Sequence, residues 1–157
     1  MRPVAKRKPI IGVIGSSECS PQVARMAEEV GRRIAERGGI LVCGGLGGVM
    51  QAAAKGAKQA GGQTIGILPD DTAETANPYI DFPIATGMGY ARNVIIVKTA
   101  DVLIAVEGKY GTLSEVAYAL IFDKPLISLG SWEVDPKVLR AKDPQEAVEM
   151  AFRAMGV

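Results

Sequence analysis

The sequence predicts a single α/β domain of three layers, in which helices cover both faces of a doubly wound, mostly parallel sheet. Apolar, β-rich runs alternate with helical patterns along the whole chain, which is the order of elements in such folds. The run Val102–Val106 is apolar at every position, as is typical of strands buried on both faces. The 157 residues, of which 48% are hydrophobic, suffice for one core of this kind.

Each predicted strand is a short apolar run, and most end at glycine or proline. Helices follow where apolar residues recur every three or four positions. Ser20 before Pro21, and Asp143 before Pro144 with Glu146 in the first turn, are typical helix starts. The predicted strands are 10–14, 40–43, 64–68, 82–85, 102–106 and 126–129, and the predicted helices begin near residues 21, 49, 90, 113 and 144.

Charge and cysteine usage narrow the class of protein. We expect residues 1–8 to form a basic, solvated tail and residues 9–157 to form the domain.

Eighteen lysines and arginines against 17 acidic residues give a net charge of +1, which favours neither a nucleic-acid nor a membrane partner. No run of 18 apolar residues is present. Two cysteines without a secretory signal are typical of a reducing compartment, so we expect a cytoplasmic protein.

The chain contains no histidine. Ser-His-Asp and Cys-His mechanisms are therefore excluded, as are zinc sites built on histidine. Two cysteines cannot make a four-cysteine zinc site either, and we predict no metal site. Proton transfer would have to use a carboxylate, lysine, tyrosine, cysteine or the ligand itself.

Three loops rich in glycine or small residues follow predicted strands. In a doubly wound sheet, all strand-to-helix loops lie at the carboxyl edge, where ligands bind. Glycine lets the backbone approach a ligand, and the helix that follows offers free N–H groups to an anion. We therefore predict a site for a phosphate-bearing ligand, although tight turns alone also use glycine. The loops are 15–17, 44–48 and 108–112; neither a Walker A nor a G-x-G-x-x-G pattern is present.

Two charged residues are expected at the same edge. Arg92 lies near the start of one predicted helix, where it can clamp a phosphate or carboxylate. Glu115 lies in the first turn of the next helix, where a carboxylate can engage a ribose hydroxyl or act as a base. On spacing alone, Thr112 and Glu115 also form a capping box, which is a purely structural alternative. Tyr90 and Tyr118 are predicted to pack against the domain.

Together these motifs resemble the Lonely Guy-like superfamily, also called lysine decarboxylase-like. The superfamily has a Pro-Gly-Gly-x-Gly-Thr-x-x-Glu loop, which is matched here by residues 107–115, with Glu107 and Lys109 as departures. An upstream Gly-Gly-x-x-Gly-[Leu/Val]-Met motif is matched by residues 44–50, and an Arg-[Lys/Asn] pair by Arg92 and Asn93. Residues 48–57, 60–62, 66–69, 77–79 and 86–89 are more similar to the short molybdenum-cofactor-carrier-like branch.

The resemblance implies a Rossmann-like fold in a homo-oligomer, as a dimer or tetramer. It implies a protein that binds a phosphate-bearing, nucleotide-like or pterin-type ligand, such as a nucleoside monophosphate or the molybdenum cofactor, with no required cofactor. The alternative is a phosphoribohydrolase that cleaves nucleoside 5′-monophosphates, with Arg92 and Glu115 as catalytic residues. An interaction module with a vestigial pocket is a third hypothesis. The predicted ligand-binding residues are Gly15, Ser16, Ser17, Gly44, Gly45, Gly47, Gly48, Met88, Arg92, Asn93, Gly108, Lys109, Tyr110, Gly111 and Thr112.

Overall fold

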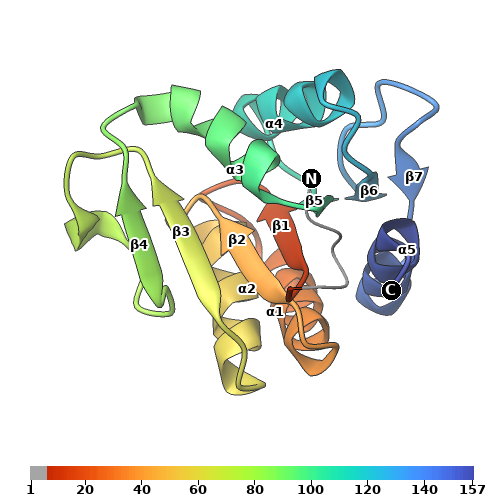
Figure 1. The fold of residues 1–157 in the computed structure, drawn as a ribbon, viewed down its shortest axis with the longest axis horizontal. Helices are drawn as coiled ribbons and strands as arrows, with labels where there is room; N and C mark the ends of the chain where they lie inside the picture. The colour runs from red at the N-terminus through yellow and green to blue at the C-terminus, as the bar shows by residue number, and fades with distance from the viewer. Residues whose placement is uncertain (1–6) are drawn as a thin grey trace.

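The computed structural model describes residues 7–157, which form a seven-stranded sheet with helices on both faces (Figure 1). Residues 1–6 of the predicted basic tail lie outside the described residues. The elements in chain order are β1 (Ile10–Ile14), α1 (Pro21–Glu36), β2 (Ile40–Cys43), α2 (Gly48–Gln59), β3 (Thr64–Leu68), η2 (Ala73–Thr75), β4 (Phe82–Ala85), η3 (Gly89–Arg92), α3 (Asn93–Thr99), β5 (Val102–Val106), α4 (Tyr110–Ile121), β6 (Leu126–Leu129), β7 (Leu139–Arg140) and α5 (Pro144–Met155).

All strand pairs in the sheet are parallel, and the spatial order is β4-β3-β2-β1-β5-β6-β7. The chain runs outward from β1 to β4 on one side and then returns to place β5 on the other side of β1. Ile11 of β1 is therefore in register with Leu41 of β2 and with Val102 of β5. The carboxyl ends of β1 and β5 form the switch point at which open α/β sheets bind ligands.

The sheet separates two apolar cores, as the predicted three-layer architecture requires. On one face, α1 and α2 cover the sheet and α5 packs beside α1 toward the β7 end, with residues such as Val30, Ala53 and Phe152 buried. On the other face, α3 and α4 cover the sheet with Ile96, Val97 and neighbours. The doubly wound fold predicted from the sequence is thus confirmed.

Glycine sets the distance between α1 and α2. A Cβ atom added to Gly31 of α1 would lie 1.9 Å from the carbonyl oxygen of Ala53. One added to Gly56 of α2 would lie 1.9 Å from the carbonyl oxygen of Glu28. The two helix backbones therefore touch at this crossing, which any larger residue would force apart.

Six strands match their predicted bounds, whereas some helix boundaries differ. The predicted helix from residue 90 is a short 3-10 turn, η3, followed by α3. The strand β7 was not predicted because its two residues, Leu139 and Arg140, are exposed and form no apolar run. Ser20 and Asp143 cap α1 and α5 through their side chains, as predicted.

The predicted capping box of α4 is wrong. The helix begins at Tyr110, two residues before Thr112, and its N-cap is Lys109, whose side chain makes no capping hydrogen bond. Thr112 is therefore already inside the first turn, and Glu115 lies one turn further along with its side chain buried. The physical reason is that Gly108, at φ 104°, turns the chain early enough for the helix to start before Thr112.

Candidate functional site

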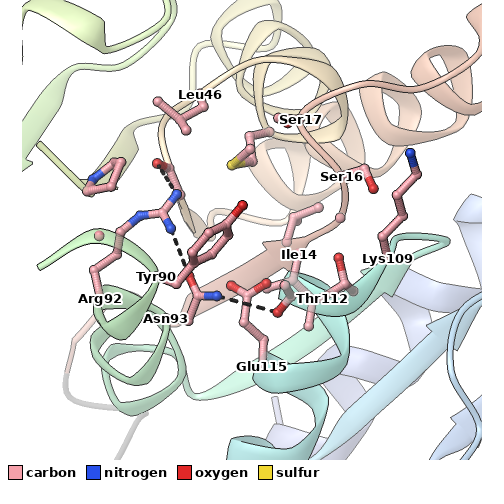
Figure 2. Close-up of a pocket in the computed structure, with 17 residues that line it drawn as sticks. Ile14, Ser16, Ser17, Leu46, Tyr90, Arg92, Asn93, Lys109, Thr112 and Glu115 are labelled. Carbon is pink, nitrogen blue, oxygen red and sulfur yellow. Dashed lines mark hydrogen bonds between the residues drawn. The ribbon is translucent and has the colours of Figure 1, made fainter.

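A cavity of about 350 Å³ lies at the carboxyl edge of the sheet, at the switch point between β1 and β5 (Figure 2). Its wall is built from the end of β1, the loops that follow β1, β2, β3 and β5, and residues of α2, η3, α3 and α4. Segments distant in sequence meet here because parallel strands bring all their following loops to one edge. The volume lies within the range of about 300–1,000 Å³ that small-molecule sites occupy.

The cavity brings together most of the residues predicted from the sequence. Those that line it are Gly15, Ser16, Ser17, Gly44, Arg92, Asn93, Lys109, Gly111, Thr112 and Glu115. The predicted residues outside its wall are Gly45, Gly47, Gly48, Met88, Gly108 and Tyr110. Gly48 serves packing instead, since a Cβ atom there would lie 2.3 Å from the carbonyl oxygen of Ser16.

Arg92 is a buried cation held by backbone and side-chain oxygens. Its Nε donates to the carbonyl of Ile67 at 2.9 Å, and its Nη2 donates to the carbonyl of Gly44 at 3.3 Å. Its Nη1 donates to Oδ1 of Asn93 at 3.0 Å. The guanidinium has five N–H groups, and three acceptors leave two N–H groups for a ligand. Burial lowers the pKa of Arg92, partly offset by Glu115, but an arginine remains charged at neutral pH.

Asn93 links Arg92 to the start of α4. Its Nδ2 donates to Oγ of Ser114 at 3.1 Å and to the carbonyl of Gly111 at 3.4 Å. Ser114 itself donates to the Gly111 carbonyl at 2.6 Å. The side chain of Asn93 thus has one fixed orientation, with its oxygen toward Arg92 and its nitrogen toward α4. This network fixes the relative position of η3, α3 and α4 around the cavity.

Glu115 is a carboxyl group in the cavity wall that has no hydrogen-bond partner within residues 7–157. The residue is only 6% exposed, and Figure 2 shows its side chain rising from α4 into the cavity. Burial raises the pKa of Glu115 to about 8, although the Arg92 guanidinium acts to lower it. At pH 7 the carboxyl group is therefore mostly protonated and can donate a hydrogen bond to a ligand.

The first turn of α4 offers an anion site at the cavity. The N–H groups of Tyr110, Gly111 and Thr112 have no acceptor among the described residues, because they begin the helix. Gly111 and Thr112 line the cavity, and Tyr110 lies next to them, outside its wall. Lys109 precedes them, and Figure 2 shows its side chain extending along the side of the cavity on which Ser16 lies. Free N–H groups, the helix dipole and a cation in one place form a site suited to phosphate.

The opposite part of the wall is apolar and was not predicted from the sequence. Leu46 and Met50 line this part together with Gly44. Position 44 has no room for a larger residue, because a Cβ atom there would lie 2.6 Å from Sδ of Met50. The other unpredicted lining residues are Val13, Ile14, Pro69, Gly89 and Tyr90. Leu46 and Met50 lie inside the predicted 44–50 motif, so their position in that loop is the signal that would have identified them.

The prediction that Tyr90 packs against the domain is wrong. Tyr90 lines the cavity and is 82% exposed, so its ring packs little against the rest of the domain. Tyr118, by contrast, stacks on Phe122 with ring centroids 6.1 Å apart and packs against the core, as predicted.

Cys43 and the acidic residues are also candidate sources of a reactive thiol or a metal site. Cys43 is buried, and desolvation raises the pKa of its thiol to about 12, so it stays protonated. Within residues 7–157, no group of three or more histidine, cysteine, aspartate or glutamate side chains is placed to hold a metal ion. No helix in this part of the chain is both long and apolar enough to cross a membrane.

Comparison with known proteins places the chain in a family. The model of the SLOG cluster4 family matches residues 8–155. The chain belongs to the SLOG cluster4 family. Among solved structures, this family member is similar to the molybdenum cofactor binding protein from the phototrophic bacterium Rippkaea orientalis, with a TM-score of 0.90 and 39% identity over 96% of this chain and 99% of that chain.

Two further relatives bear on the family member's site. The molybdenum cofactor carrier protein of Chlamydomonas reinhardtii has a TM-score of 0.89 and 40% identity, covering 96% of this chain and 100% of that chain. A cytokinin riboside 5′-monophosphate phosphoribohydrolase of Mycobacterium tuberculosis is 34% identical over 127 residues, 74% of this chain and 67% of that protein. The predicted relationship to the Lonely Guy-like superfamily and its carrier-like branch is confirmed.

Proposed function

We propose that this protein binds a phosphate-bearing, nucleotide-like or pterin-type ligand, of which the molybdenum cofactor is one example, in the cavity at the carboxyl edge of the sheet. The observation that carries the proposal is the division of the cavity into two parts. Three free N–H groups of α4 and Lys109 suit a phosphate. The apolar side of Leu46, Met50 and Pro69 suits a flat ring.

Between these two parts lie groups that can recognise the polar edge of a ligand. Arg92 keeps two N–H groups free, and the protonated carboxyl of Glu115 can both donate and accept. The names of the Rippkaea and Chlamydomonas proteins agree with this ligand class, since both refer to the molybdenum cofactor.

Native mass spectrometry of freshly purified protein, without and with added ligands, tests the proposal. We expect a mass increase corresponding to one ligand for each 16.5 kDa chain on addition of nucleoside 5′-monophosphates or the molybdenum cofactor. A thermal-shift series with the same compounds provides an independent readout. Absence of both a mass increase and a thermal shift with every compound would refute the proposal.

A second candidate function is hydrolysis of nucleoside 5′-monophosphates. It is favoured by the presence of Arg92 and Glu115 in one cavity, together with the similarity to the mycobacterial phosphoribohydrolase. Water would add to the ribose carbon as the bond to the base breaks, giving ribose 5-phosphate and the free base. Protonated Glu115 would donate its proton to the leaving base, and Arg92 would orient the ribose or phosphate. The attacking water would lose one proton to the solvent, and Glu115 would take up a proton from the solvent to return to its starting state.

An assay for release of free base from several monophosphates decides between binding alone and hydrolysis. We expect any activity to fall at least about 100-fold in Glu115→Ala, as removal of a general acid predicts. Activity that survives this change would exclude the catalytic role of Glu115. No release by the wild-type protein would leave ligand binding as the function.

The same family relationship supports a proposal that the chain forms a homodimer or homotetramer in the cytoplasm. The outer side of the α3–α4 layer is apolar, since Ile121 is 68% exposed and Ala117 lies one turn before it. Val94 and Ile95 of α3 are half-buried, and Val97 is in the core. Sedimentation velocity should show an oligomer that Ile121→Lys dissociates; a wild-type monomer would contradict this.

A further inference from the structure

The loop between β6 and β7 holds the loop that leads into α4. Oγ of Ser131 donates a hydrogen bond to the carbonyl of Glu107, and Nε1 of Trp132 donates one to the carbonyl of Lys109 at 3.1 Å. The ring of Trp132 also lies beside that of Tyr110, with centroids 6.4 Å apart. Two neighbouring residues thus contact the segment 107–110 from outside the cavity, since neither lines it.

The segment that they hold has an unusual backbone. Glu107 has φ 45° and Gly108 has φ 104°, so two successive residues lie in the left-handed half of conformational space. Residues other than glycine, such as Glu107, have a higher conformational energy at positive φ. Such a conformation persists only where contacts with the surrounding structure fix it. The hydrogen bond from Ser131 to the Glu107 carbonyl is one such constraint.

The bond from Trp132 has a direct consequence for the anion site. The carbonyl of Lys109 and the N–H of Tyr110 belong to one planar trans peptide, in which they point in opposite directions. Fixing this carbonyl therefore fixes the direction of the first free N–H group of α4. The same carbonyl accepts the N–H of Leu113 at 3.0 Å, so Trp132 and the first helical bond orient it together.

We propose that Trp132 is a positioning residue for phosphate, which aims the N–H of Tyr110 by holding the Lys109 carbonyl. This inference rests on the proposed binding of a phosphate-bearing ligand in the cavity. Trp132 does not touch the ligand; it acts through the peptide that joins Lys109 to Tyr110. Its removal should therefore weaken recognition of the phosphate and leave recognition of the rest of the ligand unchanged.

The test compares the affinities of adenosine 5′-monophosphate and adenosine, measured by isothermal titration calorimetry on the full chain. Trp132→Phe keeps an aromatic ring beside Tyr110 and removes the indole N–H. We expect it to weaken binding of the monophosphate about fivefold to tenfold, the effect of one neutral hydrogen bond, and to leave adenosine binding unchanged. Val134→Ala, in the same loop with an exposed side chain, is the matched control and should change neither affinity.

If Trp132→Phe weakens the binding of both compounds equally, or weakens the binding of neither, the positioning role of Trp132 is overturned, while the proposal of nucleotide binding stands. Wild-type protein that binds neither compound contradicts nucleotide binding itself, and the role of Trp132 with it. If Trp132→Phe does not fold, Trp132→Tyr replaces it, because this change also removes the indole N–H that donates to the Lys109 carbonyl. We expect the same selective loss of monophosphate affinity from Trp132→Tyr, and an unchanged ratio of the two affinities contradicts the proposal.

Discussion

Arg92 and Glu115 lie in the wall of one cavity, both at 6% exposure, and no hydrogen bond or ion pair joins them within the described part of the chain. The guanidinium is instead turned toward the carbonyls of Ile67 and Gly44 and the side chain of Asn93. The cavity therefore contains a cation with spare N–H groups and a carboxyl group without a partner. Because the Glu115 carboxyl opens onto the cavity, a ligand there can supply the hydrogen bond that the protein does not.

Arg92→Lys tests whether the geometry of the guanidinium matters beyond its charge. Lysine has three donors on one nitrogen and cannot span the carbonyls of Ile67 and Gly44 while also facing a ligand. We expect affinity for a nucleoside 5′-monophosphate to fall at least about tenfold, by calorimetry, because charge-assisted bonds are worth about 1.5–3 kcal/mol. Arg25→Lys, at an exposed arginine of α1, is the control. Unchanged affinity in Arg92→Lys would show that charge alone suffices.

The pKa of Glu115 predicts how stability depends on pH. Because its pKa in the folded state is raised to about 8, the folded protein binds this proton more tightly than the unfolded chain does. The stability that this group contributes is complete below its unfolded pKa of about 4.3 and is lost as pH rises through about 8. We expect Glu115→Gln to gain stability relative to wild type between pH 5 and 8, in urea unfolding experiments. A constant difference across this range would mean that Glu115 is ionised in the folded state.

Lys109 should contribute to phosphate affinity mainly through its charge. We expect Lys109→Ala to weaken binding of a nucleoside monophosphate severalfold and to reduce the salt dependence of binding, since one cation fewer faces the phosphate. Titrations at two ionic strengths measure both effects. Lys142→Ala, an exposed cation near α5, is the matched control. If Lys109→Ala binds more tightly, the lysine crowds the site rather than assisting it.

The crossing of α1 and α2 predicts a purely structural effect. Gly56→Ala would place a Cβ atom 1.9 Å from the Glu28 carbonyl, so the helices must separate. We expect a loss of about 1–3 kcal/mol in the free energy of unfolding, despite the higher helix propensity of alanine. Gln59→Ala, exposed on the same helix, should stay within about 0.5 kcal/mol. Equal stability of the two variants would contradict the close contact.

The sequence predicted the bounds of the strands better than the lining of the cavity. Strands such as Val102–Val106 are continuous apolar runs whose limits are visible in the sequence, and parallel topology then places their loops at one edge. The start of α4 was harder to predict. Thr112 and Glu115 fit the pattern of a capping box, but the turn at Gly108 lets the helix begin two residues earlier, at Tyr110. Tyr90 was misjudged because its exposure depends on the direction of η3, which periodicity does not encode.

The apolar wall and the contacts of Trp132 depend on tertiary structure in the same way. Leu46 lies in a predicted loop, yet nothing in its local sequence shows that it lines the same cavity as Arg92. The bond from Trp132 to Lys109 spans 23 residues and joins two loops whose proximity follows only from the pairing of β5 with β6. Such relationships require the folded chain.

Equilibrium binding of nucleoside 5′-monophosphates, the matching nucleosides and the molybdenum cofactor to the wild-type protein tests directly whether this cavity holds a phosphate. We expect at least one phosphorylated compound to bind saturably with one site per chain, and Arg92→Lys to weaken that binding. A matching nucleoside should bind at least about tenfold more weakly, because it leaves the N–H groups of α4 unpaired. Failure of every phosphorylated compound to bind, or equal affinity for both forms, would contradict the claim that this cavity holds a phosphate.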